Sequence, residues 1–96
     1  MGREMARVTV ELPSVLDDVM KGERSLGVEA STLREALRKV TAEHPQLEVH
    51  LFDESGGFRQ HVLCFHNKTN TRWLESLDVA VAEGDTIRIL QAVSGG

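Results

Sequence analysis

The residues best suited to chemistry stand at the end of the sequence, which closes on Ala92-Val93-Ser94-Gly95-Gly96. Glycine has no Cβ, so two glycines in a row make a slim segment that can enter a narrow active site. The reacting group would be the carboxylate of Gly96, which becomes a good electrophile once it is coupled to AMP. A sulfur nucleophile could then displace AMP and leave a thiocarboxylate, whereas an amine or a thiol would join the chain to another molecule.

An inert end is the alternative interpretation of the same glycines. The chain has 8 glycines in 96 residues, so a final Gly-Gly arises by chance roughly once in 150 chains of this composition. Chain ends are also commonly frayed. The glycines follow the last predicted strand without a polar spacer, which favours a functional tail, and the fold predicted below favours it further.

A second group of reactive side chains, His61, Cys64 and His66, raises the possibility of a metal site. In a strand, alternation places Cys64 and His66 on one face and His61 on the other. Two ligands are too few, because zinc takes four, or three plus water, and we therefore expect no metal. Leu63 and Phe65 are the more apolar pair, so we assign them to the core and expect Cys64 and His66 to face outwards.

This assignment predicts a partner face. Cys64, Arg88 and Leu90 would lie together on the exposed side of the sheet, near the root of the tail. A plain solvated sheet surface is the alternative. The acidic pairs at 17–18 and 53–54 lie in polar loops and receive no catalytic role, so we expect no enzyme active site.

Two strands are predicted in the first third of the chain. Apolar and polar residues alternate over residues 8–12, up to Pro13, and again over residues 26–29. We expect these strands to pair antiparallel. Residues 14–23 between them are predicted to form a mixed, polar loop.

A helix follows, predicted from about Leu33 to Glu43. Its apolar positions 33, 36, 37 and 40 have the spacing of one helix face. Thr32 and Glu35 have the spacing of a capping box, and Pro45 marks the far end.

The second half of the chain is predicted to be mainly strands and turns. Residues 46–60 are expected to be a looser region with a turn at 55–57, followed by a strand over 61–66 and a polar turn over 67–70. Residues 72–74 are expected to form a short edge strand on which Trp73 packs. After a turn at Gly84-Asp85, a last strand spans Thr86 to Gln91, with Ile87 and Ile89 facing inwards.

This order of elements predicts an α+β fold, in which one main helix packs across one face of a mixed sheet. The first and last strands have the most regular patterns and are expected to lie centrally. The arrangement is the ubiquitin-like β-grasp. Residues 1–91 would form this domain, and residues 92–96 a flexible C-terminal tail.

Composition excludes several classes of protein. The apolar share is 41% and the charged share 27%, as in ordinary soluble domains, and no apolar run approaches the ~20 residues of a membrane span. No signal peptide is evident, so we expect a cytoplasmic protein. The net charge is −4 with scattered basic residues, which argues against nucleic acid and favours a protein partner with a basic surface. The single cysteine excludes an internal disulfide.

The stretch DVAVAEGDTIRILQAVSGG resembles the end of the MoaD/ThiS family of sulfur-carrier proteins. RVTVELPSVL is similar to the first strand and loop of that family, ASTLREALRKVTAEHP to its helix, and HVLCFHN to its third strand. Nearly the whole chain is covered. The long first loop and the DESGGFRQ segment look most like the CysO-type members.

The resemblance implies a specific function. In this family a separate activating enzyme uses ATP to adenylate the terminal glycine, here Gly96, which then becomes a thiocarboxylate and donates sulfur to a biosynthetic enzyme. Gly95, Ser94 and Val93 would form the tail presented to the activating enzyme, and the exposed sheet face would meet that enzyme. The expected partners are therefore an adenylating enzyme, a sulfur donor and a sulfur-accepting enzyme. No bound cofactor is implied, and we expect a monomer when the protein is free.

Two alternatives stay open. A protein modifier, conjugated through the same Gly96, would use the same activated carboxylate. A non-catalytic interaction module would have an inert tail. The sequence does not identify the sulfur-containing product, for which cysteine is one possibility.

Overall fold

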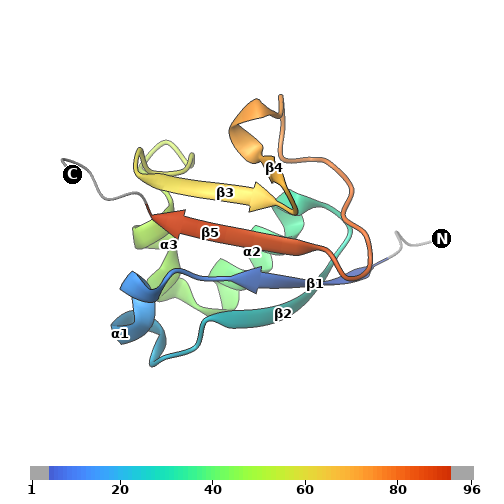
Figure 1. The fold of residues 1–96 in the computed structure, drawn as a ribbon. Helices are drawn as coiled ribbons and strands as arrows, with labels where there is room; N and C mark the ends of the chain where they lie inside the picture. Colours follow the sequence, from blue (N-terminus) through green and yellow to red (C-terminus); the bar gives the residue numbers. More distant parts are fainter. Residues whose placement is uncertain (1–4, 92–96) are drawn as a thin grey trace.

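The computed structural model describes residues 5–91 of the chain. Its centre is a five-stranded mixed sheet in the order β2-β1-β5-β3-β4 (Figure 1). The strands are β1 (Ala6–Glu11), β2 (Ser25–Ala30), β3 (Val62–His66), β4 (Thr69–Asn70) and β5 (Thr86–Gln91).

The first and last strands lie side by side in the middle of this sheet, as the sequence predicted. β1 and β5 are parallel, with Val10 opposite Ile87. β2 is antiparallel to β1, and β3 is antiparallel to both β5 and β4. The strand order and the helix across one face make up the predicted β-grasp.

The main helix, α2 (Leu33–Glu43), has the predicted bounds. Thr32 caps it, since its hydroxyl oxygen accepts a hydrogen bond from the Glu35 N–H at 3.1 Å. The Glu35 carboxylate in turn accepts one from the Ser31 N–H at 2.7 Å. Because the helix begins at a fixed residue, its apolar stripe faces the sheet, and its four predicted apolar residues are all buried.

The prediction of a polar loop over residues 14–23 was wrong. This segment forms two short helical turns, η1 (Ser14–Leu16) and α1 (Asp17–Met20). Leu16 and Met20 are buried, and Lys21 ends α1 with a left-handed backbone (φ 54°). Four helical residues are too few to show a periodicity in the sequence.

The predicted looser region over residues 46–60 was also partly wrong, because it begins with a second substantial helix, α3 (Pro45–Leu51). Pro45 both follows the end of α2 and opens α3, since proline suits the first turn of a helix. Leu47 and Leu51 of this helix are fully buried. The predicted turn that follows is confirmed, with Gly56 at φ 89°.

The short edge strand was predicted three or four residues too late, at 72–74 instead of 69–70. Residues 71–73 form a helical turn, η2 (Thr71–Trp73), and the edge strand is β4 just before it. Trp73 does not pack on the sheet edge as expected, because it is 82% exposed. The Asn70 side chain begins η2 by accepting a hydrogen bond from the Arg72 N–H.

The core lies between the helices and the inner face of the sheet. Every second residue of the four longer strands points into it, and α2 and α3 cover it. Ile87 and Ile89 of β5 face inwards as predicted, at 0% and 1% exposure. Among residues 5–91, no helix has the length and apolar character that crossing a bilayer requires.

Candidate functional site

The residues predicted to carry or present sulfur, Gly96, Gly95, Ser94 and Val93, lie outside the described part of the chain. What the structure does describe is the strand that leads to them. β5 is hydrogen-bonded on both sides, to β1 and to β3 (Figure 1). Its last residue, Gln91, is opposite Val62. The segment that follows therefore starts from a strand fixed in the middle of the sheet.

The start of β5 is fixed by a polar cluster around Asp85. The Asp85 carboxylate accepts hydrogen bonds from the Ala82 N–H at 2.8 Å and the Asn67 amide at 3.1 Å, and His66 Nε2 lies 2.7 Å from it. The Ala82 N–H and then the His66 ring hold the pKa of Asp85 below its ordinary value. Gly84-Asp85 was predicted only as a turn. Aspartate is common in turns because its carboxylate accepts hydrogen bonds from nearby backbone groups, which is the signal that could have indicated this cluster.

Cys64 does not belong to the exposed face, and that prediction was wrong. It is 1% exposed, whereas the neighbouring Leu63 and Phe65 are only half-buried. The reason is the register with β5, since Cys64 lies opposite Ile89, and paired residues share a face of the sheet. Leu63 and Phe65 therefore lie on the outer face. The error came from ranking the two alternating sets by hydrophobicity, although unpaired cysteine is among the most buried residue types.

Burial also settles the chemistry of this thiol. It raises the pKa of Cys64 to about 11, with a smaller opposing effect from the Thr71 hydroxyl. Because the thiolate is the reactive form of cysteine, the Cys64 side chain is protonated and unreactive at neutral pH.

The outer side of β3 and β5 carries what we call the open face, made of the half-buried Leu63 and Phe65 on β3 and the exposed Arg88 and Leu90 on β5. Leu90 is opposite Leu63, and Arg88 is opposite Phe65. Leu90 is one of the few large apolar side chains that remain exposed, at 40%. Two of the three residues predicted for the partner face, Arg88 and Leu90, are thus on the exposed side of the sheet.

Arg88 is held in place by a neighbour on β1. Its Nε donates a hydrogen bond to Glu11 Oε1 at 2.8 Å, in an exposed ion pair. The pair places one positive and one negative group beside the apolar Leu63 and Leu90. This combination of an apolar centre with charges at its border is typical of a protein–protein contact surface.

His61, Cys64 and His66, which were considered as metal ligands and rejected, have different surroundings in the structure. His61 lies just before β3, and His66 is engaged with Asp85. Across residues 5–91, no three His, Cys, Asp or Glu side chains are grouped closely enough to hold a metal ion.

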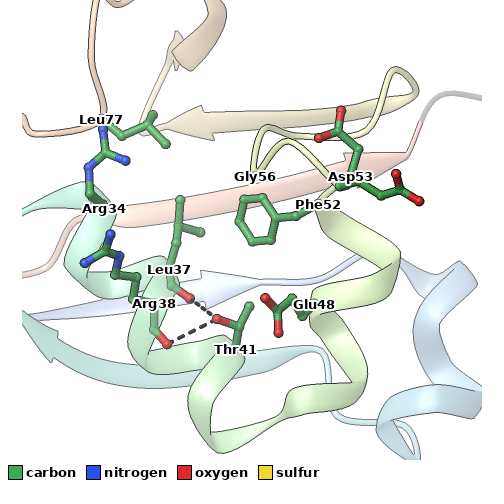
Figure 2. A pocket seen from close by; sticks show the side chains of 10 residues that line it. Arg34, Leu37, Arg38, Thr41, Glu48, Phe52, Asp53, Gly56 and Leu77 are labelled. Carbon is green, nitrogen blue, oxygen red and sulfur yellow. Dashed lines mark hydrogen bonds between the residues drawn. The ribbon is translucent and has the colours of Figure 1, made fainter.

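A hollow of about 370 Å³ lies on the helical side of the molecule, between α2 and the segment after α3 (Figure 2). Several of its polar groups are bonded within the protein. Arg34 pairs with Asp78 at 2.7 Å, and the Thr41 hydroxyl donates to the carbonyls of Leu37 and Arg38. Cys64, Arg88 and Leu90, the residues predicted for the partner face, are not among the described residues that line this hollow.

Comparisons with known proteins match almost the whole chain. The model of the ThiS family matches residues 16–96. The sulfur carrier protein CysO of Mycobacterium tuberculosis is 31% identical over 91 residues, which cover 93% of this chain and 98% of that protein. The family match extends to Gly96, the last residue of the sequence.

Solved structures show the same similarity in three dimensions. A chain of the Amycolatopsis orientalis BexX/CysO complex superposes with a TM-score of 0.79 at 30% identity, covering 93% of this chain and 99% of that one. The small archaeal modifier protein 1 of Methanosarcina acetivorans superposes with a TM-score of 0.78 at 29% identity, covering 97% and 99%.

Proposed function

Because this chain belongs to the ThiS family, and its relatives include sulfur carriers, we propose that it carries sulfur as a thiocarboxylate on Gly96. In this proposal the protein is a substrate and carrier rather than a catalyst. The enzymes that activate the carboxylate, supply the sulfur and accept it are separate proteins.

The proposed reaction has two steps. A carboxylate oxygen of Gly96 attacks the α-phosphorus of ATP, pyrophosphate leaves, and an acyl-adenylate forms. Hydrosulfide then attacks the acyl carbon, AMP leaves with the electron pair of the C–O bond, and the thiocarboxylate remains. A persulfide donor would instead give an acyl disulfide, from which a second thiol releases the thiocarboxylate by disulfide exchange.

The observation that carries the proposal is the extent of the family match, which runs through Gly96. Five residues separate the end of β5 at Gln91 from Gly96, inclusive of Gly96. Fully extended, five residues span at most roughly 17 Å. The carboxylate can thus reach an active site in a partner while the domain stays outside it, and the buried, protonated Cys64 offers no competing sulfur nucleophile.

The open face is the proposed docking surface for the activating enzyme. Two of its residues, Arg88 and Leu90, belong to β5, the strand that leads to the tail, so one partner could contact both at once. The A. orientalis relative was solved in a complex with BexX, which supports a protein partner for this chain as well.

Intact mass spectrometry tests this proposal. The full chain is incubated with ATP, sulfide and the adenylating enzyme of the same organism. We expect a mass increase equal to the replacement of one oxygen by sulfur, which fragmentation assigns to Gly96.

Two variants serve as controls. Deletion of Gly95 and Gly96 should abolish the mass change, whereas Cys64→Ala should leave it intact. The proposal fails if the truncated chain still gains sulfur, or if the added mass is found at Cys64.

Conjugation to other proteins is the second candidate function. It is favoured by the similarity to small archaeal modifier protein 1, which covers nearly all of both chains. An amine would then displace AMP from the same acyl-adenylate and form an amide. Higher-mass species in cell extract that carry this chain, and that vanish when Gly96 is deleted, would support conjugation.

A further inference from the structure

We propose that the free edge of β2 binds an extended, basic peptide segment of a partner protein, which joins the sheet as an additional strand. This site goes beyond the proposed sulfur-carrier function and uses none of the residues of the tail or the open face. β2 is the outermost strand on its side of the sheet, and β1 is its neighbour (Figure 1).

The backbone groups that point away from β1 can be identified from the register. Leu12 N–H donates to the Arg24 carbonyl at 2.8 Å, which continues the antiparallel pairing of β1 and β2. Hydrogen-bonded pairs alternate along such a ladder, so the even-numbered residues of β2 bond to β1. The N–H and C=O groups of Ser25, Gly27 and Glu29 therefore point outwards.

Most of this edge is open. Among residues 5–91, one of these outward-pointing groups is already hydrogen-bonded, because Lys39 Nζ donates to the Glu29 carbonyl at 2.6 Å. That leaves both backbone groups of Ser25 and Gly27, and the N–H of Glu29, to pair with an incoming strand. An exposed row of this kind is a template for strand addition unless the protein covers it.

A groove of about 370 Å³ runs beside the edge, between β2 and the end of α2. Leu26 and Val40 are part of its lining and are 9% and 3% exposed. Side chains of an added strand alternate between two faces, so every second one would enter this groove. The apolar base of the groove suits a small or β-branched side chain there.

The charges along the groove determine the kind of peptide. Glu23 and Glu43 line it, are exposed, and take part in no ion pair within residues 5–91. His44 is the basic residue of the lining, and Lys39 is already bonded to Glu29. Lysine or arginine in the peptide would therefore find two available carboxylates, whereas an acidic peptide would be repelled.

The position of the edge allows two partners at the same time. β1 lies between β2 and β5, so a peptide on β2 does not occupy the open face or the end of β5. A partner could thus hold the carrier by β2 while the tail is engaged by an enzyme.

The test is an NMR titration of the full chain with a synthetic peptide of alternating valine and threonine, with two lysines at each end. We expect the amide signals of Ser25, Gly27 and Glu29 to shift, and their hydrogen exchange to slow at least about ten-fold, because free edge amides become hydrogen-bonded. The same peptide with glutamates in place of the lysines should bind at least about ten-fold more weakly.

A matched pair of variants tests the edge itself. Gly27→Pro removes the central donor at a position where an edge strand tolerates proline, and should weaken peptide binding at least about ten-fold. Gly27→Ala keeps the donor and should bind within about three-fold of the parent, since its Cβ would meet only the flexible end of Arg7, at 3.3 Å. If Gly27→Pro does not fold, Glu23→Lys with Glu43→Lys should still reduce affinity for the lysine peptide and improve it for the glutamate peptide.

Several results would overturn the proposal. These are no change at millimolar peptide, equal binding by Gly27→Pro and Gly27→Ala in folded proteins, or shifts confined to Leu63, Arg88 and Leu90. Protection of the same three amides without peptide, growing with protein concentration, would identify a second copy of the chain as the occupant instead. Sulfur loading on Gly96 is measured in the same Gly27→Pro variant. If loading is intact, a negative result in the peptide titration argues against the β2 site alone and not against the proposed carrier function.

Discussion

Alternate residues of β5 face two different environments. Ile87 and Ile89 are 0% and 1% exposed and lie in the core, whereas Arg88 and Leu90 are exposed on the open face. The two sets are separated by single residues along one strand. One strand therefore supplies both fully buried core side chains and the exposed side chains of the proposed docking surface.

The two faces of β5 are expected to respond differently to substitution. Changes on the inner face should lower the free energy of unfolding, because they leave a cavity or an unfavourable buried charge. Changes on the open face should alter binding, because solvent already reaches those side chains.

The largest effect is expected for Ile89→Ala. Removing three buried carbons should lower the free energy of unfolding by about 2–5 kcal/mol, as for other large-to-small core substitutions. Leu90→Ala is the matched control on the other face of the same strand and should cost less than about 1 kcal/mol. Urea denaturation measures both, and equal losses would show that the faces are not separate. If Ile89→Ala does not fold, Ile89→Val, at about 0.5–1.5 kcal/mol, keeps the comparison measurable.

The next largest effect is a loss of stability at high pH caused by Cys64, which lies on the inner face of the sheet. An unfolded thiol ionises near pH 9.0, whereas burial raises the pKa of folded Cys64 to about 11. As pH rises through this window the unfolded state loses its proton first, so stability that is complete below pH 9 is lost towards pH 11. Linkage sets the loss at about 2–3 kcal/mol.

Cys64→Ala isolates this loss from other groups that titrate in the same range. Its stability, followed by denaturation from neutral pH to about 11, should fall less steeply than that of the parent by the amount given above. Parallel curves for the two proteins would mean that the thiol is open to solvent, as the sequence analysis first assumed.

Periodicity and capping predicted much of the fold. The helix over Leu33–Glu43 was predicted correctly because the apolar residues at 33, 36, 37 and 40 and the Thr32 cap both define it. β5 was predicted with its observed bounds, and β1 within two residues of its own, because buried apolar residues recur at every second position. These two strands lie next to each other inside the sheet.

The elements that were missed have short or ambiguous patterns. Helix α3 has seven residues, and proline at its start was interpreted only as the end of α2. In β3 both alternating sets are apolar, so the sequence does not say which faces inwards, and only the pairing of Cys64 with Ile89 decides it. The exposure of Arg88 and Leu90 was therefore predicted correctly, and that of Cys64 wrongly. That this face binds a partner stays a prediction.

The smallest effect on folding, and the sharpest on recognition, is expected for Leu90→Glu. The side chain is 40% exposed, so the free energy of unfolding should change by less than about 1 kcal/mol. A charge on the proposed docking surface should nevertheless raise the KM for this chain in adenylation at least about ten-fold, since it is desolvated on binding.

Val49→Glu is the matched control for this change. Val49 lies on α3, away from the open face, and is 62% exposed, so the same new charge should leave adenylation unaltered. Steady-state kinetics with the activating enzyme, alongside urea denaturation, separate docking from stability. Equal KM values for the two variants and the parent would remove the open face from the proposal, whereas equal rises in both would point to net charge rather than to a surface. A rise for Leu90→Glu alone would show that β5 uses adjacent residues for folding and for recognition.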